Sequence, residues 1–244
     1  MTATSCFRPS FSVVIPVFGE AAGIDALIDH ARVVGYGQDV ELVVVDGDPA
    51  ASTLAALTRD GVTTLTSPPG RARQLNAGAR AASGRDLLFL HADTRLPAGA
   101  FQAAGAALDG GAALGAFSLA IRSTNPWLAA VATGATWRSR LFSLPFGDQA
   151  FFIRREIFDA LGGFPDIPIM EDVALVRAVS RAGGRIAVLP GRVTTSARRW
   201  ETEGVVRTTA RNLCLQLLYG LGVSPARLAR HYPPMPALSR RRGG

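Results

Sequence analysis

From residue 11 to residue 93, short apolar runs alternate with longer segments in which apolar residues recur at helical spacing. Runs that are apolar nearly throughout are typical of parallel β-strands covered on both faces. Because parallel neighbours need a right-handed crossover, the alternation predicts an open, mostly parallel, twisted α/β sheet flanked by helices. The expected strands are 11–17, 40–47, 62–68 and 85–93, and the expected helices between them are 20–35, 49–61 and 70–84.

The second half of the chain is less regular but contains the same two kinds of segment. Strands are expected at 113–123, at the start of 147–164 and, as one strand or two, in 185–196. Helices are expected at 125–142, 170–184 and 203–222. No internal repeat or low-complexity linker separates the two halves, so we expect them to share a single sheet.

Length and hydropathy indicate one folded domain. A chain of 244 residues can bury one good core, and a hydrophobic fraction of 48% argues against disorder. We expect a flexible tail over 1–10, a single domain over 11–232 and a basic flexible tail over 233–244.

The positive charge of the chain comes entirely from arginine. All 26 basic residues are arginines, and the net charge is +7. Two explanations for the excess of arginine stay open: codon bias in a GC-rich genome favours arginine, and the planar guanidinium group suits the binding of phosphates. The sequence contains no nucleic-acid-binding motif, so we expect no nucleic acid partner.

Cellular location is inferred from what the chain lacks. Cys6 and Cys214 form no disulfide or metal pattern, and neither a signal peptide nor an apolar run long enough to span a membrane is found, so we expect a cytoplasmic protein. The helices expected at 125–142 and 203–222 are unusually apolar, and the tail after them is basic. Two interpretations stay open: peripheral contact with an anionic membrane, on the inner face of the cell membrane, or packing into the core or a homodimer.

Two strands end in aspartate. Asp46 ends the strand at 40–47, and the strand at 85–93 ends in His91-Ala92-Asp93. Carboxyl ends of parallel strands form the crevice in which open α/β sheets bind ligands, and a carboxylate there can hold a divalent cation on a nucleotide diphosphate. Asp93, with His91 as a second ligand, is therefore the candidate metal site. Alternatively, Asp46 forms a turn and His91–Asp93 is only a polar strand exit.

Other charged residues stand where helices begin. Arg71 and Arg73 open the helix at 70–84, where backbone N–H groups and guanidinium groups both meet an anion. Glu171 and Asp172 stand in the first turn of the helix at 170–184, either as a catalytic base or as simple complements to the helix dipole. No glycine-rich phosphate loop follows the first strand, which argues against ordinary NAD or ATP sites.

Two further motifs suit a sugar or pyrophosphate. The stretch FGDQAFFIRR places Asp148 and Gln149 at the start of a strand, and TSARRWE places Arg198, Arg199 and Trp200 between a strand and a helix. A tryptophan flanked by arginines combines a stacking surface with anion binding, so these residues are candidates for the acceptor and diphosphate site.

Taken in order, the motifs resemble a known family. The chain looks like a family 2 glycosyltransferase of the GT-A fold, and more narrowly like the radical-SAM/selenodomain-associated glycosyltransferases. The resemblance runs from about residue 12 to about residue 232. It is carried by SVVIPVFGE, VVVDG, GRARQLNAGA, LLFLHADTRLP, FGDQAFFIRREIFDALGGFPDIPIMEDVALVRAV and TSARRWETEGVVRT.

The resemblance implies a metal-dependent, inverting transfer of a sugar from a nucleotide-sugar, a UDP-sugar being the expected donor. It assigns 11–110 to a Rossmann-like nucleotide-sugar half, 111–202 to the acceptor and catalytic half, and 203–232 to a C-terminal helix. The acceptor is expected to be a hydroxyl or carboxyl group, with a lipid or isoprenoid among the candidates. Mg²⁺ or Mn²⁺ is the expected cofactor.

The resemblance also implies roles for single residues. The nucleotide-sugar ligands would be Pro16, Val17, Glu20, Asp46, Arg71, Asn76 and Asp93. Asp93 would bind metal in the position of the family's Asp-x-Asp motif, whose first aspartate is replaced here by His91. Asp172 would be the general base beside Glu171.

Two rival functions stay open. A sugar-phosphate nucleotidyltransferase shares the α/β sheet but usually carries a glycine-rich, basic loop after the first strand, which this chain lacks. A degenerate transferase would bind nucleotide-sugar without turning it over. Donor turnover assays distinguish the rivals from a transferase.

Overall fold

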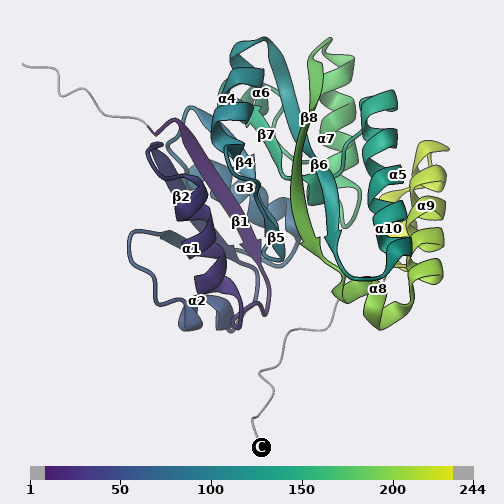
Figure 1. Cartoon of the computed structure of the whole chain (residues 1–244), viewed down its shortest axis with the longest axis horizontal. Helices are drawn as coiled ribbons and strands as arrows, with labels where there is room; N and C mark the ends of the chain where they lie inside the picture. Colours follow the sequence, from purple (N-terminus) through teal and green to yellow (C-terminus); the bar gives the residue numbers. More distant parts are fainter. Residues whose placement is uncertain (1–8, 233–244) are drawn as a thin grey trace, which may run out of the picture.

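A computed structural model describes residues 9–232 of the chain (Figure 1). Its eight strands form one sheet. They are β1 Phe11–Val17, β2 Val40–Asp46, β3 Thr63–Thr66, β4 Asp86–Phe89, β5 Thr94–Arg95, β6 Ala112–Arg122, β7 Phe151–Arg154 and β8 Arg185–Ser196. The helices are α1 Ile24–Val34, α2 Ser52–Ala56, α3 Arg71–Ala81, α4 Ala100–Asp109, α5 Pro126–Phe142, α6 Arg155–Ala160, α7 Glu171–Arg181, α8 Arg198–Glu203, α9 Val205–Gly220 and α10 Pro225–Ala229, with a 3₁₀ turn, η1, at Gly147–Gln149.

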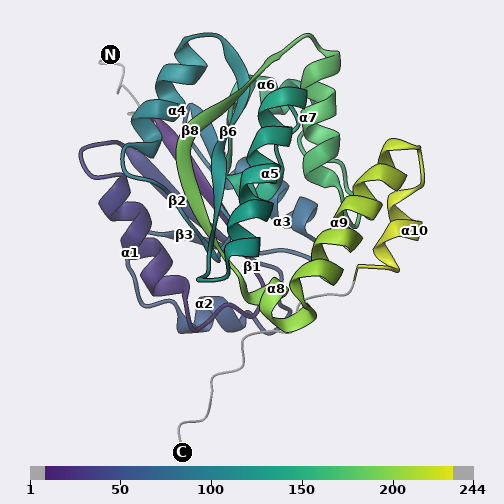
Figure 2. The same ribbon diagram turned by 45° about the vertical axis from the view of Figure 1, so that its right-hand side comes forward.

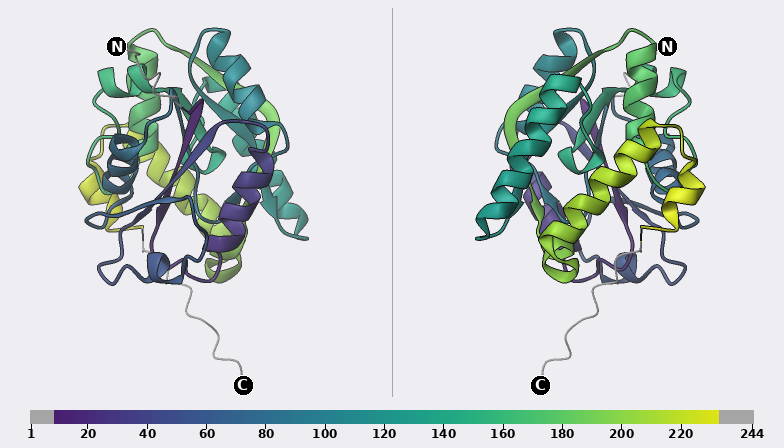
Figure 3. Two further views of the ribbon diagram at one scale, coloured as in Figure 1. Left: turned by 90° about the vertical axis from the view of Figure 1, so that its left-hand side faces the viewer. Right: turned by 90° about the vertical axis from the view of Figure 1, so that its right-hand side faces the viewer.

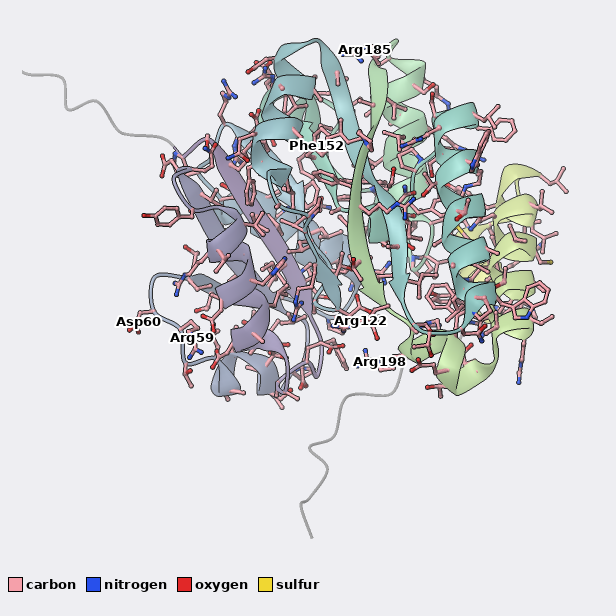
Figure 4. All side chains as sticks on the ribbon, viewed as in Figure 1. Arg59, Asp60, Arg122, Phe152, Arg185 and Arg198 are labelled. Atoms are coloured by element: carbon pink, nitrogen blue, oxygen red, sulfur yellow. The ribbon has the colours of Figure 1, made fainter. Side chains whose placement is uncertain are left out.

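The strand order is β3-β2-β1-β4-β7-β6-β8-β5. Strands β1 to β4 pair in parallel, β6 and β8 also pair in parallel, and β7 and β5 are antiparallel to their neighbours. The expected open, mostly parallel α/β sheet is therefore confirmed. Figure 4 shows the polarity of β8: Arg185 at its start lies at the upper edge of the molecule, whereas Arg198, just past its end, lies at the lower edge.

Helices cover both faces of the sheet, as the edge-on views show (Figure 3). Val13 and Ile15 of β1 point into a core with α1, α4 and α5, whereas Val14 points into a second core with α3, α6 and α7. This follows from the two-residue period of a strand, which sends alternate side chains to opposite faces. Burial on both faces explains why these strands read as continuous apolar runs.

The helix expected at 49–61 is much shorter in the structure. Only α2 is helical, because the chain leaves the helix at Leu57, whose ψ is 121°. The next residue, Thr58, is held by α1: its backbone N–H and its hydroxyl both donate to the Asp25 carboxylate. A tertiary contact, invisible to local periodicity, ends this helix.

Both ends of the domain differ in part from expectation. Residues 9 and 10, expected in a flexible tail, are bonded: Arg85 N donates to Pro9 O and Ser10 N donates to Asp39 O. The helix expected at 203–222 is confirmed as α9, but the C-terminal helix expected to fill 203–232 is interrupted: Gly222, with a left-handed φ of 89°, separates α9 from α10. An unexpected short helix, α8, precedes Gly204. Residues 1–8 and 233–244, expected to form tails, lie outside the described residues.

Strand β8 is a single strand with an irregularity that matters for the site. Its register against β6 shifts after Phe117: Phe117 pairs with Leu189, but the next residue, Ser118, pairs with Arg192. The carboxyl end of β8 then pairs with β5, so that Thr195 lies opposite Thr94. The last strand of the sheet is thereby brought back to the loop that follows β4.

Candidate active site

Four segments far apart in the sequence meet beyond the carboxyl ends of the central strands, which is where open α/β sheets bind ligands. They are the loop 90–93 after β4, the start of α3, the turn η1 and the start of α7. Each delivers at least one charged side chain. The carboxyl end of β8 closes the group through its contact with Asp93.

Asp93 is held by two threonines. Its Oδ1 atom accepts long hydrogen bonds from the hydroxyl groups of Thr94 (3.3 Å) and Thr195 (3.5 Å). Because Thr195 lies on β8, the curl of the sheet positions this carboxylate. Neither bond uses Oδ2, so that oxygen can face a ligand.

His91 lies beside the η1 turn. A Cβ atom added to Gly147 would be 3.4 Å from the Nε2 atom of His91. Burial, and secondly the Arg71 cation, lower the pKa of His91 to about 3. The ring is therefore neutral near pH 7, the form in which imidazole can act as a ligand.

Arg71 and Glu171 form an ion pair across the crevice. The Arg71 Nη1 atom lies 3.5 Å from Glu171 Oε1, and the arginine side chain is 48% exposed while that of the glutamate is 4% exposed. Burial raises the pKa of Glu171 to about 7, with Arg71 opposing the rise and Asp172 adding to it. Desolvation lowers the pKa of Arg71, but this is outweighed by its acidic neighbours Glu171, Tyr232, Asp172 and Asp93.

Asp172 is oriented by two backbone N–H groups. Its Oδ2 atom accepts from Gly147 N at 2.8 Å, and its Oδ1 atom accepts from Val173 N at 2.8 Å. The first bond joins α7 to the η1 turn, and the second fixes the carboxylate against its own helix. Met170, in a left-handed conformation with φ of 68°, sets the sharp entry into this helix.

Asp148 faces the same space, together with an arginine that the sequence motifs did not single out. Desolvation, then Asp172, raises the pKa of Asp148 to about 6, against the opposing charge of Arg138. Arg138 comes from α5, and its guanidinium stacks 3.6 Å from the ring centroid of Phe146. Asp148 Oδ1 and Arg138 Nε and Nη2 are buried without hydrogen-bond partners among residues 9–232. Buried polar atoms without partners require an explanation, and a polar ligand bound in this space would supply one.

Gln149 lies next to Asp148 but does not face the crevice. It is fully buried: its Nε2 donates to Phe117 O at 2.7 Å, and its Oε1 accepts from Ser139 Oγ at 2.7 Å and Phe146 N at 3.1 Å. The expectation of an acceptor or diphosphate ligand is therefore corrected. Gln149 anchors the turn that presents Asp148.

The side chain of Asp46 is also buried. Its Oδ1 atom accepts from Asp48 N at 2.9 Å, and its Oδ2 atom accepts from Thr53 N at 3.0 Å and Leu54 N at 3.2 Å. Because three backbone N–H groups occupy the carboxylate, the expected contact with a nucleotide base is corrected to a capping role for α2 and the loop before it.

The two β1 residues predicted to line the nucleotide pocket differ from each other. Val17 is 2% exposed and packs in the core, while its carbonyl oxygen accepts from Gly47 N at 3.0 Å and Gln74 Nε2 at 2.7 Å. Its expected pocket-lining side chain is therefore corrected to a core side chain. Pro16 is only partly buried, so its ring is the one that can face a ligand.

Glu20 and Arg198, predicted to serve different subsites, contact each other. Arg198 Nη2 donates to Glu20 Oε1 at 2.9 Å, joining the loop after β1 to the start of α8. Both side chains are mostly buried, at 24% and 18% exposure for the arginine and the glutamate. The pair ties the two halves of the chain together at the edge of the crevice.

Both polar atoms of the Asn76 side chain are hydrogen-bonded within the protein. Its Nδ2 donates to Phe164 O at 2.7 Å, and its Oδ1 accepts from Phe164 N at 2.9 Å. This two-way bond fastens α3 to the loop that follows α6. The expected role of Asn76 in binding the nucleotide is therefore corrected: it anchors α3, the helix that carries Arg71.

Arg199 belongs to a compact group of charged and aromatic side chains. Its guanidinium lies 4.5 Å from the ring centroid of Tyr232, and that of Arg211 lies 5.2 Å from the same ring. Both arginines are also ion-paired with Glu203. Tyr232 in turn contributes to the charge environment of Arg71, so this group borders the crevice.

Trp200 is anchored rather than free to stack. Its Nε1 donates to Thr209 Oγ1 at 3.3 Å, and its ring packs against the core shared by α1, α4 and α5. The expected sugar-stacking ring is thus partly covered on one side. Trp200 fixes α8 against α9.

The predicted residues thus separate into three groups. One group meets in the crevice: His91, Asp93, Arg71, Asp148, Glu171 and Asp172. A second borders it: Pro16, Glu20, Arg198, Arg199 and Trp200. A third anchors the surrounding structure: Val17, Asp46, Asn76 and Gln149.

Sequence reasoning missed Arg138, Thr195, Arg211 and Tyr232. The only local signal for Arg138 was its place in α5, a mostly apolar helix that also carries Arg140. Thr195 offered no signal, because its proximity to Asp93 depends on the curl of β8.

The donor set around Asp93 fits a shared cation better than a closed metal cage. Among residues 9–232, no group of three or more His, Cys, Asp or Glu side chains is placed to hold a metal ion. Magnesium in phosphate-binding sites is typically held by one or two carboxylates together with substrate phosphates and water. A single carboxylate whose hydrogen bonds to the two threonines use only one oxygen, near a neutral imidazole, fits that pattern.

Two solved structures with a similar fold are complexes with nucleotide-sugars. The mannosyltransferase PcManGT from Pyrobaculum calidifontis, in complex with GDP-Man and Mn²⁺, matches with a TM-score of 0.63 at 20% identity over 95% of this chain and 67% of that one. TarS 1–349 from S. aureus, in complex with UDP-GlcNAc, matches with a TM-score of 0.58 at 17% identity over 77% of this chain and 58% of that one. A search of curated proteins finds no match.

The sequence itself supports the same assignment. Residues 12–162, more than half of the chain, match the model of glycosyl transferase family 2. The matched region includes β1, the α3 start, the His91–Asp93 loop and Asp148. With the α/β fold and a charged crevice at the carboxyl ends of its strands, the chain belongs to glycosyl transferase family 2.

Proposed function

We propose that this protein transfers a sugar from a nucleotide-sugar donor to a hydroxyl or carboxyl acceptor in a single displacement with inversion. The observation that carries the proposal is the meeting of Asp93, at the end of the nucleotide-binding half, with the Asp172 and Asp148 carboxylates of the second half around Arg71. Two neighbours of the same fold are complexes with GDP-Man and UDP-GlcNAc. A UDP-sugar is the donor we expect here. We also propose membership of the radical-SAM/selenodomain-associated subgroup, on the sequence motifs alone.

The donor diphosphate is proposed to lie between Arg71 and Asp93. Arg71 stands at the start of an eleven-residue helix, where the helix dipole and backbone N–H groups favour an anion, and half of its side chain is exposed to the crevice. When bound, a divalent cation on Asp93 supplies positive charge to the departing diphosphate. Glu171 holds the Arg71 guanidinium in place through the ion pair.

Asp172 is the proposed general base. The hydroxyl of the acceptor gives its proton to the Asp172 carboxylate as its oxygen forms a bond to the anomeric carbon. The bond from that carbon to the diphosphate oxygen breaks, and its electron pair leaves with the nucleoside diphosphate. The two backbone N–H groups that hold Asp172 fix its direction without supplying a competing proton donor from a side chain.

A donor panel tests the proposal. UDP-, GDP- and dTDP-sugars are incubated with the protein, Mn²⁺ and simple hydroxyl- or carboxyl-bearing acceptors, and products are analysed by proton NMR of the anomeric position. Release of nucleoside diphosphate with inverted anomeric configuration is the expected result. Retention of configuration contradicts the single displacement.

The rival functions give different results, one of them with a second set of substrates. Release of pyrophosphate when a sugar phosphate and a nucleoside triphosphate are supplied identifies a nucleotidyltransferase instead. Nucleotide binding without turnover of any donor identifies a degenerate, binding protein.

A further inference from the structure

Helices α5 and α9 contact each other on one flank of the molecule (Figures 1, 2 and 3). Both turn large apolar side chains outward. On α5 the exposed fractions are 73% for Trp127, 65% for Trp137, 67% for Leu141 and 73% for Phe142. On α9 they are 82% for Val206, 49% for Leu213 and 69% for Leu217, and Leu221 just after α9 is 81% exposed. We name these eight residues the α5–α9 apolar face.

The spacing shows that the exposed residues form stripes. Val206, Leu213 and Leu217 are seven and four residues apart, so they share one side of α9. Trp127, Gly134 and Leu141 recur every seven residues along α5, and a Cβ added to Gly134 would meet nothing within 4 Å. A surface helix normally buries its apolar stripe, so these two helices each carry a second stripe that residues 9–232 leave uncovered.

The charged residues of α5 and α9 are all arginines. Neither α5 nor α9 contains an aspartate or a glutamate, while Arg140 and Arg207 are exposed. A groove of about 500 Å³ runs along α5 against β6 and β8, and its lining includes Trp137, Arg140 and Arg192 but no acidic residue. Ser118 on the groove wall accepts a hydrogen bond from Arg140 Nη2 at 3.1 Å.

From these features we infer that the α5–α9 apolar face docks on an anionic lipid bilayer, with Arg140, Arg192 and Arg207 meeting lipid phosphates. Exposed tryptophans beside leucines and arginines are typical of helices that lie in the bilayer interface. Among residues 9–232 no helix is long and apolar enough to cross a membrane, so the contact lies along the surface. A second copy of this chain fits less well, because two acid-free, arginine-bearing faces would place like charges against each other.

The same two helices also wall the candidate active site. Arg138, on the inner flank of α5, lies by Asp148 and bonds Gln216 of α9 at 3.5 Å. Docking through the outer flank therefore places the crevice within about the width of one helix, about 10 Å, of the bilayer surface. This step rests on the proposed function: it assigns the acceptor to the class of lipids that carry a polar hydroxyl, carboxyl or phosphate group at the interface.

Vesicle binding tests the inference independently of any sugar transfer. The full chain is mixed with vesicles of phosphatidylcholine, or with vesicles containing about one third phosphatidylglycerol, and binding is measured by co-sedimentation and tryptophan fluorescence. We expect binding to the anionic vesicles only, weakened by high salt, with a blue shift from Trp127 and Trp137. Quenching by brominated acyl chains should reach these tryptophans.

A matched pair of double variants locates the contact. Leu141→Ser with Phe142→Ser should weaken vesicle binding about tenfold or more, because two exposed apolar side chains no longer enter the interface. Val33→Ser with Tyr36→Ser removes two equally exposed apolar side chains from the end of α1 and should leave vesicle binding unchanged. Unchanged nucleotide binding in solution would show that both proteins are folded.

Two outcomes overturn the inference. In the first, the wild type and both double variants bind anionic vesicles equally well, or the wild type binds neutral and anionic vesicles equally well. The other is no vesicle binding together with a dimer, seen by sedimentation velocity, that Leu141→Ser with Phe142→Ser dissociates; the face would then be a protein interface. Neither outcome bears on donor turnover, so failure here is distinct from failure of the proposed function.

Discussion

Glu171 and Asp172 are adjacent in the sequence but meet very different surroundings. Glu171 points inward, is 3% exposed and pairs with Arg71, whereas Asp172 accepts hydrogen bonds from Gly147 N and its own helix. Burial raises the pKa of Glu171, with Arg71 opposing the rise and Asp172 adding to it. The two residues therefore suit different tasks: Glu171 positions Arg71, and Asp172 receives a proton.

Replacing Asp172 tests its role as base. Asp172→Asn keeps the shape of the side chain but cannot accept a proton, so kcat should fall by about 10²–10⁴-fold. Binding of nucleoside diphosphate, measured by titration calorimetry, should be unchanged. Residual turnover within a few-fold of wild type would contradict the role, whatever the binding result.

Glu171 predicts a pH dependence of stability. Its pKa is raised from an ordinary value of 4.5 to about 7 in the folded protein, so the folded state binds more protons than the unfolded chain between these values. The stability due to protonated Glu171 is therefore present below about pH 4.5 and is lost as the pH rises through about 7.

Glu171→Gln removes this titration. Urea unfolding at about pH 5 and about pH 8 should show a smaller fall in the free energy of unfolding for the variant than for wild type. Glu201→Gln, at an exposed position, controls for the loss of one acidic group. Parallel falls for wild type and Glu171→Gln would rule out the raised pKa.

At the scale of elements, short contacts decide where helices begin and how closely they pack. The Asp46 carboxylate satisfies the N–H groups of Thr53 and Leu54, which open α2. Gly78 lets α3 lie directly on the sheet, since a Cβ there would overlap Val14 Cγ1 and lie 2.9 Å from Val45 Cγ2.

Asp46→Ala should destabilise the protein without touching a ligand. The substitution leaves three backbone N–H groups without their acceptor, two of them at the start of α2, and should cost about 2–4 kcal/mol in the free energy of unfolding. Thermal and urea unfolding measure the loss. Asp48→Ala, which removes a carboxylate nearer the surface, should cost less; an equal cost would argue against the capping role.

Two helical glycines should respond to alanine with opposite sign. Gly78→Ala crowds Val14 and Val45 and should destabilise by about 1–3 kcal/mol. Gly134→Ala, where the new Cβ meets open space, should stabilise by about 0.4–1 kcal/mol by restricting the unfolded chain. Chemical denaturation of both variants is the check, and a shared sign would refute the packing argument.

At the scale of the whole molecule, the curl of the sheet assembles the proposed donor site. Asp93 follows the fourth strand, and the hydroxyl of Thr195, 102 positions away in the sequence, reaches it from the last long strand. The Glu20–Arg198 pair spans 178 positions in the same way. Ligand binding at such a site should stabilise the whole fold, because the site exists only when both halves are docked.

Metal-dependent nucleotide binding should therefore raise the unfolding temperature. Wild type with UDP and Mn²⁺, at about one hundred times the dissociation constant, should gain about 2.7 kcal/mol, and chelation of the metal should remove most of the gain. Asp93→Ala should respond to the nucleotide equally with and without Mn²⁺. A metal-dependent gain retained in that variant would exclude Asp93 as the ligand.

Much of the fold is predictable from the chain because secondary structure leaves a local periodic signal. The strands β1, β2, β4 and β6 and the helices α3, α5 and α7 lie within a few residues of their expected bounds. Charged residues at strand and helix ends likewise indicate the crevice, since topology brings those ends together. By itself the sequence thus determined the α/β architecture, the edge of the sheet at which the candidate site lies and the six titratable residues that meet there.

The partners of polar side chains were decided only by the tertiary structure. Asn76, Asp46 and Gln149 carry the same functional groups as ligand-binding residues, but backbone groups elsewhere in the fold take up their hydrogen bonds. Arg138 enters the site because α5 folds against the η1 turn, and the apolar face of α5 and α9 stays outward because no described segment packs on it. The physical reason is the distance along the sequence over which each property is set. Periodicity depends on neighbouring residues, whereas hydrogen bonding and burial depend on residues up to 178 positions apart.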